Sequence, residues 1–389
     1  MEPKLPYTVG YVSVADPHDR RSWSGTHYFL MKALEERFLE VVPLGPMEPQ
    51  PEQFIGQAFN QITLKVLGKR FNHRDSFLLA RAYRRVLQRR MSGKHFDLLV
   101  APAGLTAVAL LDTDVPIVHI NDRCLAGALG YHAILRDLLP FSQREGLALE
   151  QRTLRQATLN IYASQWAADA ARLVAPDLSG RIHTIPFGVN LPLIPPIPAT
   201  RAFPEGPLRL LFIGTKWVEK GGPIAYDALQ ALKRQGIQAT LTVCGSMPPE
   251  QFNDPALLRE GFLDKNDPAQ LDRLQELLRT ADFLIVPTRF EAYGIVFCEA
   301  AAYGIPALAT RTGGVPTIIE HGATGFLFRL EEGGEAYAER IVQLLGQPEQ
   351  WQAMRAAARA RFEQQFTWPA FVERLVDQLS WLGVINSSR

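Results

Sequence analysis

The chain has 389 residues, more than one hydrophobic core usually supports, so we expect two domains. Hydrophobic residues make up 47% of it, which suits large buried sheets, and the formal net charge of +1 argues against a nucleic-acid-binding protein. No apolar run approaches the roughly 20 residues of a membrane-spanning helix. Three widely separated cysteines indicate reduced thiols. The amino terminus enters a strand pattern directly, so we expect a cytoplasmic protein.

The first expected strand, 7–14, is followed by a polar loop and then by a helix over about 26–38. Ser24 is placed to cap this helix, and Gly25 allows a ligand to approach the backbone closely. The loop is therefore a candidate phosphate-binding loop. It lacks the full glycine-rich dinucleotide fingerprint, so a plain helix cap is an equal alternative.

A second helical pattern, predicted over 61–90, follows a proline-rich connection and is rich in arginine. Such a basic helix could make peripheral contact with an anionic membrane or hold an anionic acceptor, and a solvated helix face is the alternative. Buried parallel strands are predicted at 97–102 and 115–120. The second leads to Asp122, which is a site candidate because open α/β sheets bind ligands at the carboxyl ends of their strands.

Four other side chains that suggest chemistry are assigned to structure. Asp112 and Asp114 have the spacing of a metal-binding Asp-x-Asp motif, but they lie in a predicted turn, so we assign them to the surface. His119 stands within a predicted buried strand and is expected to be a core residue. Cys298 lies inside a helical pattern and is expected to pack rather than to act as a nucleophile.

Proline stiffens the segment 191–205, which we predict to be a linker. It separates an N-terminal domain, 1–190, from a C-terminal domain, 206–365, and a terminal helical segment occupies 366–389. In both domains strand patterns alternate with helical ones, which predicts an α/β fold with doubly wound parallel sheets.

The second domain carries the pattern around which the chain is organised. A strand-like run at 282–288 leads into a short polar turn and then into a helical pattern that ends at Gly304. This arrangement places Glu291 in the turn and Glu299 inside the helix. The helix N-terminus between them favours a diphosphate, and Glu299 is placed to accept hydrogen bonds from a ribose diol. Alone, the two glutamates fit the solvated ends of an ordinary α/β crossover.

The residues that follow favour the site instead. A buried strand at 304–310 precedes Thr312-Gly313-Gly314-Val315-Pro316 and the stretch 320–328. With them the chain resembles the retaining glycosyltransferases of family 4, whose signature is two Glu separated by seven residues in the second domain of a GT-B fold. The segment 186–190 also looks like the family's Pro-x-Gly-Val-Asp/Asn. The resemblance implies two Rossmann-like domains facing a central cleft, with the last helix crossing back to the N-terminal domain.

The family usually carries Gly-Arg-Leu-x-x-Glu-Lys-Gly after the first strand of the second domain, and its Arg and Lys grip the diphosphate. This chain matches at Lys220 but has Thr215 at the Arg position, which removes a bidentate phosphate contact unless Lys216 supplies a cation. By resemblance Glu291 would face the sugar and Asp122 would orient or assist the acceptor. The donor-binding residues would be Gly25, Lys216, Lys220, Tyr293, Gly294, Ile295, Val296 and Glu299.

The resemblance further implies transfer of a sugar, which we expect to be a hexose, from a nucleoside-diphosphate sugar to an acceptor hydroxyl, with retention of configuration. The first domain would bind the acceptor, a glycan, lipid-linked or small molecule, and hinge closure would assemble the site. We expect no metal or other cofactor and no nucleic-acid partner. The alternatives are a nucleotide-sugar epimerase of the same fold, which would need no acceptor, and a noncatalytic sugar- or nucleotide-binding protein.

Overall fold

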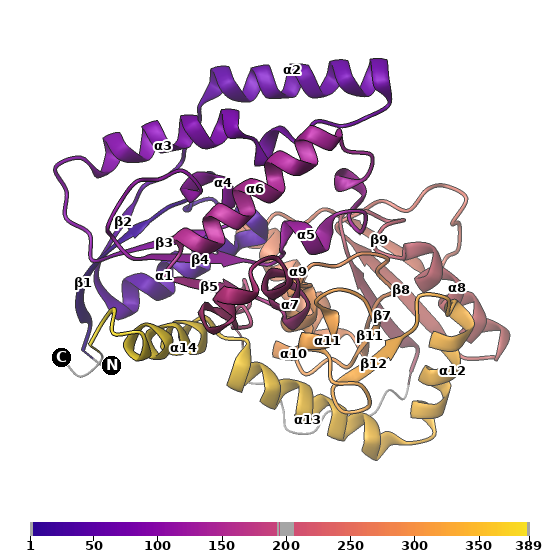
Figure 1. Cartoon of the computed structure of the whole chain (residues 1–389). Helices are drawn as coiled ribbons and strands as arrows, with labels where there is room; N and C mark the ends of the chain where they lie inside the picture. Colours follow the sequence, from indigo (N-terminus) through magenta and orange to yellow (C-terminus); the bar gives the residue numbers. More distant parts are fainter. Residues whose placement is uncertain (1–2, 193, 195–205, 387–389) are drawn as a thin grey trace. The chain divides into compact units, whose positions relative to one another are not determined.

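The computed structural model describes residues 3–192, 194 and 206–386. The chain divides into two compact units: Met1–Pro186 with Trp368–Arg389 is unit 1, and Phe187–Thr367 is unit 2 (Figure 1). Most of the expected linker, 191–205, lies outside the described residues. Within the described chain, no helix has both the length and the apolar character needed to cross a membrane.

Unit 1 contains, within its described residues, a six-stranded sheet in which every pairing is parallel. Its strand order is β2-β1-β3-β4-β5-β6. The inner strands β3, β4 and β5 are buried along their whole length, as expected of apolar strands covered by helices on both faces. The strands are β1 (Leu5–Tyr11), β2 (Phe38–Pro43), β3 (Leu98–Pro102), β4 (Ile117–Asn121), β5 (Leu159–Tyr162) and β6 (Ile182–Thr184).

Unit 2 contains a second six-stranded parallel sheet in its described part, in the order β12-β11-β10-β7-β8-β9. The two sheets confirm the predicted α/β class. The strands are β7 (Leu208–Ile213), β8 (Ala239–Cys244), β9 (Leu257–Gly261), β10 (Phe283–Val286), β11 (Ala307–Thr310) and β12 (Gly325–Phe328). The helices of this unit are α8 (Gly222–Arg234), α9 (Pro268–Thr280), α10 (Ile295–Ala302), α11 (Val315–Ile318), α12 (Gly334–Leu345) and α13 (Pro348–Gln365).

The helices of unit 1 differ from the sequence-based prediction at one place. They are α1 (Thr26–Arg37), α2 (Gln50–Leu67), α3 (Phe77–Met91), α4 (Leu105–Val108), α5 (Leu125–Ala128), α6 (Pro140–Gln156), α7 (Gln165–Val174) and α14 (Trp368–Trp381). The single helix expected over 61–90 is wrong. Gly68, with φ of +64°, ends α2, and the Ser76 hydroxyl caps α3 by accepting a hydrogen bond from the N–H of Leu79.

The terminal helix α14 belongs to unit 1, where it packs against α1. Arg37 on α1 donates from Nε to Oε1 of Glu373 on α14 at 2.8 Å. Beyond the helix, the N–H of Asn386 donates to the Tyr7 hydroxyl at 2.7 Å. Asn386, the last described residue, is thus hydrogen-bonded to a side chain of β1.

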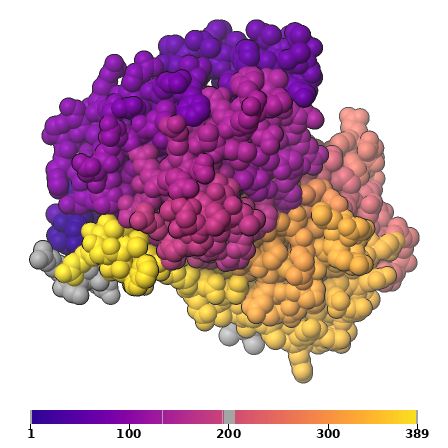
Figure 2. Space-filling view, viewed as in Figure 1, coloured from indigo at the N-terminus to yellow at the C-terminus, as the bar shows by residue number. Residues whose placement is uncertain are grey.

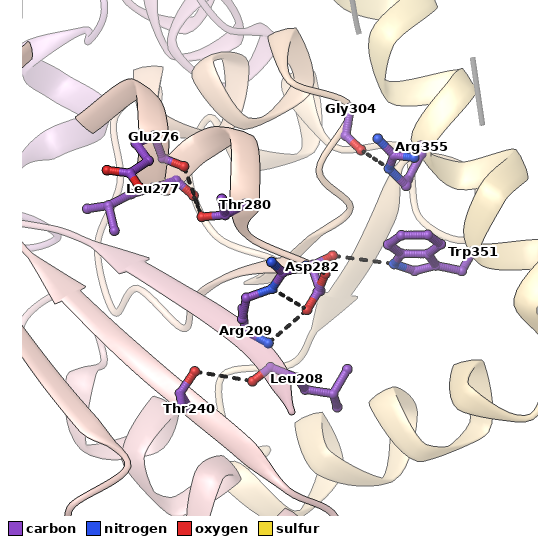
Figure 3. Close-up of polar contacts among 10 residues, drawn as sticks. All are labelled: Leu208, Arg209, Thr240, Glu276, Leu277, Thr280, Asp282, Gly304, Trp351 and Arg355. Atoms are coloured by element: carbon purple, nitrogen blue, oxygen red, sulfur yellow. Dashed lines mark hydrogen bonds and ion pairs between the residues drawn. The ribbon is translucent and has the colours of Figure 1, made fainter. Parts of the chain in front are cut away.

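The start of the unit 2 sheet is held by a buried carboxylate. Asp282, directly before β10, accepts hydrogen bonds from the backbone N–H and the guanidinium of Arg209 on β7, at 2.8 and 3.0 Å (Figure 3). The indole of Trp351 on α13 donates to the backbone carbonyl of Asp282 at 3.3 Å. Burial raises the pKa of Asp282, because the carboxylate has no access to water. Strands β7 and β10 are therefore fixed to each other at their amino ends.

Replacing this carboxylate should destabilise unit 2. In Asp282→Ala the N–H and guanidinium of Arg209 lose their acceptor, and we expect a loss of about 2 to 4 kcal/mol in free energy of unfolding. Urea denaturation, with hydrogen exchange of peptides from β7 and β10, measures the effect. The matched control is Asp272→Ala on the exposed side of α9, which should change stability by less than about 0.5 kcal/mol. Equal effects of the two substitutions would contradict this role of Asp282.

Candidate functional site

The order of the strands indicates where unit 2 would bind a ligand. From β7 the sheet grows through β8 to β9 on one side, and β10 then pairs with the other side of β7. Open α/β sheets bind ligands at the carboxyl ends of the strands where the order reverses in this way. The two loops at that point are 214–221, after β7, and 287–294, after β10.

These two loops meet through a lysine and a glutamate. Nζ of Lys220 lies 2.6 Å from Oε2 of Glu291, and both side chains are largely buried. The backbone joins the loops as well, because the N–H of Arg289 donates to the carbonyl of Glu219 at 2.8 Å. The structure thus brings together two of the predicted site residues, 71 positions apart in the sequence.

A glycine makes this close approach of the loops feasible. Gly221 has φ of +77°, and a Cβ at this position would lie 1.9 Å from the carbonyl oxygen of Pro287. Any residue with a side chain at this position would push the two loops apart. Because Gly221 has no side chain, the two loops can approach each other and Lys220 can lie near Glu291.

The N-terminus of α10 lies directly after the Glu291 loop. Gly294 is its N-cap with φ of +97°, a conformation that favours glycine, and Ile295 and Val296 form the first turn. The first N–H groups of a helix have no acceptor inside the helix and carry the positive end of its dipole. The start of α10 therefore offers donors and positive potential beside the Lys220 and Glu291 pair.

The side chain of Tyr293 is buried and does not face a ligand site. Its hydroxyl donates to the carbonyl of Phe187 at 3.0 Å and accepts from Sγ of Cys298 at 3.2 Å, inside the core of unit 2. Tyr293 can therefore meet a ligand through its backbone N–H rather than through its hydroxyl. Burial raises the pKa of the Cys298 thiol, which agrees with the expected packing role.

The second glutamate is buried and paired with a lysine that the sequence analysis did not identify. Oε1 of Glu299 lies 2.5 Å from Nζ of Lys265, and the two side chains are only 3% and 20% exposed. Lys265 also lies 3.5 Å from the carbonyl of Asn190. It follows β9, so a correct prediction of that strand would have placed a cation at a carboxyl end and drawn attention to it.

Lys216 does not join this arrangement. Its Nζ contacts both carboxylate oxygens of Glu219 at 3.0 and 2.9 Å, and the two side chains are 50% and 40% exposed. The proposal that Lys216 replaces the arginine missing at Thr215 therefore stays a prediction.

A second constellation lies in unit 1, where Trp23, which the sequence analysis did not identify, connects the loop of Gly25 to Asp122. The indole Nε1 of Trp23 donates to Oδ2 of Asp122 at 3.1 Å, which links the loop after β1 to the carboxyl end of β4. Trp23, Ser24 and Gly25 all have positive φ, of 49°, 58° and 95°. Two consecutive non-glycine residues in this conformation store strain, which occurs most often at ligand sites. Gly25, rather than the expected Ser24, is the N-cap of α1.

A buried carboxylate supports the loop that carries Asp122. Glu150 on α6 accepts hydrogen bonds from the N–H groups of Leu125 and Ala126, at 2.5 and 2.9 Å. Burial raises the pKa of Glu150. His119, on β4 itself, is buried and contacts Asn160, as expected of a core residue, and burial lowers its pKa to about 4.

The described residues contain no group of three or more His, Cys, Asp or Glu side chains that could hold a metal ion. Asp112 and Asp114 are exposed, and Oδ2 of Asp112 lies 3.8 Å from Arg84. The pair therefore lies at the surface of unit 1, on the amino side of β4, whereas Asp122 follows the carboxyl end of that strand.

Both units match family models of glycosyltransferases. Residues 28–192 match the family model described as Glycosyltransferase Family 4, and residues 207–347 match the model described as Glycosyl transferases group 1. The chain belongs to the family 4 type of glycosyltransferases. The D-inositol 3-phosphate glycosyltransferase of Xylanimonas cellulosilytica is 27% identical over 68% of this chain and 66% of its own length. The match thus spans slightly less than two thirds of that relative.

Solved structures confirm the GT-B fold of the chain. HepE of Anabaena, determined in complex with UDP and glucose, has a TM-score of 0.64 at 18% identity, covering 96% of this chain and 100% of HepE. Sucrose-phosphate synthase of Thermosynechococcus elongatus has a TM-score of 0.68 at 18% identity, covering 98% and 99%. At these identities the likeness concerns the fold.

The buried pair of Lys265 with Glu299 and the exposed pair of Lys216 with Glu219 should contribute very differently to the free energy of unfolding. In Lys265→Ala the buried Glu299 loses its cation, and we expect a loss of about 3 kcal/mol in free energy of unfolding. The control is Lys216→Ala, whose exposed pair with Glu219 should contribute less than about 1 kcal/mol. Urea denaturation of both variants measures the difference. A cost as small for Lys265→Ala as for the control would mean that Glu299 is not held by Lys265.

Proposed function

We propose that the protein transfers a hexose from a nucleoside-diphosphate sugar to an acceptor hydroxyl, with retention of anomeric configuration. The observation that carries this proposal is the contact between Lys220 and Glu291 at the switch point of unit 2, beside the N-terminus of α10. A cation and helix N–H groups stabilise a departing diphosphate, and a carboxylate beside them can hold the hydroxyls of the sugar.

In the proposed reaction the bond between the anomeric carbon and the diphosphate oxygen breaks while the acceptor oxygen approaches from the same face. Lys220 and the N–H groups of Ile295 and Val296 neutralise the charge that develops on the diphosphate. The acceptor proton passes to the departing phosphate oxygen. Glu291 holds the sugar and stabilises its positive character, so no side chain need act as a separate base.

The nucleoside would lie toward Glu299, which is the fifth residue of α10. Its carboxylate is fixed by Lys265 and would accept hydrogen bonds from the ribose diol. Since HepE was determined with UDP and glucose, uridine donors are the first to be screened. Inositol 3-phosphate, named for one relative, is a first acceptor to try.

The acceptor would be held by unit 1. Asp122, oriented by the indole of Trp23, offers a carboxylate for an acceptor hydroxyl, and Gly25 lies in the adjacent strained loop. We also place the protein in the cytoplasm, because Cys124, Cys244 and Cys298 are all unpaired and buried.

A donor and acceptor screen tests the proposed function. Thermal shift with nucleoside diphosphates and their sugars identifies the donor, and mass spectrometry of acceptor mixtures identifies the product. Release of nucleoside diphosphate that depends on acceptor is the expected result. A changed sugar with donor alone would instead show an epimerase, and donor binding without any turnover would favour a noncatalytic binding protein.

The transfer should proceed without a metal ion. Lys220 and the dipole of α10 supply positive potential at the diphosphate, so EDTA should leave the initial rate nearly unchanged. The measurement is the rate of product formation with and without chelator. Loss of activity on chelation, restored by titration with Mg²⁺ or Mn²⁺, would reject metal independence.

Removing the amine of Lys220 should slow the reaction. A charge-assisted contact to phosphate contributes about 1.5 to 3 kcal/mol, so Lys220→Ala should lower donor-dependent turnover roughly ten- to a hundredfold. Lys94→Ala, an exposed lysine of unit 1, is the control. If Lys220→Ala is folded and has normal kinetics, the diphosphate lies elsewhere, and Lys216 becomes the next residue to test.

The two glutamates should give different kinetic effects. A ribose contact is similar in the ground and transition states, so Glu299→Ala should raise the donor KM by roughly ten- to a hundredfold. Glu291 faces the reacting sugar, so Glu291→Ala should mainly lower kcat. Calorimetry with free nucleoside diphosphate should show weaker binding for Glu299→Ala and little change for Glu291→Ala. The opposite pattern would exchange the roles of the two carboxylates.

A further inference from the structure

Helix α2 carries an unusual number of exposed apolar side chains. Of the sixteen exposed large hydrophobic residues found in the described chain, six lie on this one helix of 18 residues. The exposed fractions reach 72% for Phe54, 59% for Ile62 and 73% for Val66. The six are Phe54, Ile55, Phe59, Ile62, Val66 and Leu67.

Four of these side chains form one stripe along the helix. Ile55, Phe59, Ile62 and Val66 follow one another at spacings of four, three and four residues, which is the period of one helix face. The ring of Phe59 lies 6.3 Å from that of Phe141, a half-exposed aromatic residue at the start of α6. We call the stripe together with Phe141 the α2 face.

The other side of α2 is firmly attached to unit 1, so the helix cannot roll to bury the α2 face. Gly56 packs so closely that a Cβ would lie 2.7 Å from Cβ of His73. Oδ1 of Asn60 accepts a hydrogen bond from the N–H of Phe71 at 2.9 Å. Figure 1 shows α2 along the margin of unit 1, with α3 and α6 on one side of it, and Figure 2 shows its indigo surface.

The segment of the chain that carries the stripe of the α2 face is strongly basic. Residues 50–91 contain nine Lys and Arg and two acidic residues, an excess of seven in a chain whose net charge is +1. Asp75 is buried, and Glu52 is paired with Arg85, so neither presents a free negative charge. Among the described residues no ion pair involves the following cations: Lys65, Lys69, Arg74, Arg81 and Arg89.

A groove on α3 adds donors suited to phosphate groups. It is lined by Leu78, Arg81, Arg84, Arg85 and Gln88. The guanidinium of Arg81 lies 5.7 Å from the ring of Phe77, and Arg84 is only 3.8 Å from a single carboxylate oxygen. Guanidinium groups bind phosphate oxygens through paired hydrogen bonds.

We propose that the α2 face docks on an anionic lipid membrane, with α2 lying in the plane of the interface. The apolar stripe enters the boundary between headgroups and acyl chains, and the basic residues contact the headgroup phosphates. The helix lies on the membrane rather than crossing it, because no described helix can span a bilayer. This role is independent of the transfer reaction proposed above.

The charge favours a membrane over a second copy of the chain. A symmetric dimer through this face would set the same patch against itself and oppose two surfaces that both carry an excess of positive charge. An anionic bilayer supplies both the apolar phase and the opposite charge.

Flotation of the full chain with lipid vesicles tests the proposal. The protein should float with vesicles of phosphatidylcholine and phosphatidylglycerol and bind much less to phosphatidylcholine alone. Its binding to the anionic vesicles should weaken as the salt concentration is raised. The double variant Ile62→Gln, Val66→Gln should lose at least about tenfold in partitioning. The control is Leu173→Gln, which removes an apolar side chain that is 84% exposed on α7 of the same unit and should bind like the unmodified chain.

The basic residues are tested separately. Lys65→Gln with Lys69→Gln should reduce binding to the anionic vesicles but not the weak binding to neutral ones, whereas Lys94→Gln should leave both unchanged. Circular dichroism and thermal melts establish that each variant is folded, which is expected because all the positions are exposed.

Tryptophan fluorescence gives a direct readout of insertion. Val66→Trp should add a blue-shifted emission when anionic vesicles are present, and Leu173→Trp should not. Absence of vesicle binding by the unmodified chain, or equal binding by the α2 and Leu173 variants, would overturn the proposal. So would light scattering that shows self-association abolished by the α2 double variant, because the face would then join two copies of the chain.

Discussion

The buried carboxylate of Asp282 fixes the geometry on which unit 2 depends. It ties the start of β10 to Arg209 on β7, and these are the two strands between which the strand order reverses. Because strands in a parallel pair stay in register, fixing their amino ends also fixes where their carboxyl ends stand. The loops that carry Lys220 and Glu291 start from those ends, so a contact of 2.6 Å between the two side chains rests on an ion pair at the opposite edge of the sheet.

The inner strands of both sheets could be predicted because each is a short apolar run, buried on two faces. The edge strands β2 and β9 could not. Their solvent-facing positions carry Glu40, Arg259 and Glu260, so no continuous apolar run marks them. The predicted helix over 61–90 failed for a related reason, since arginine content does not reveal the turn that begins at Gly68.

The part of the candidate site formed by residues close together in the sequence could be predicted. Glu291, Glu299 and the start of α10 belong to one continuous stretch, and their arrangement follows from a strand, a turn and a helix. The sequence analysis did not identify Lys265 and Trp23, because their partners are 34 and 99 residues away in the sequence. Such contacts depend on which loops the topology brings together, and single-sequence patterns do not contain that information.

The contact between Lys220 and Glu291 means that the site contains its own counter-ion before any donor arrives. An ammonium group has three N–H donors, so Lys220 can contact a diphosphate oxygen while it keeps its contact with Glu291. In the proposed reaction the hydroxyls of the sugar would add to the groups that compensate Glu291. Neither charge of the pair would be left without a partner as the donor enters or as the product leaves.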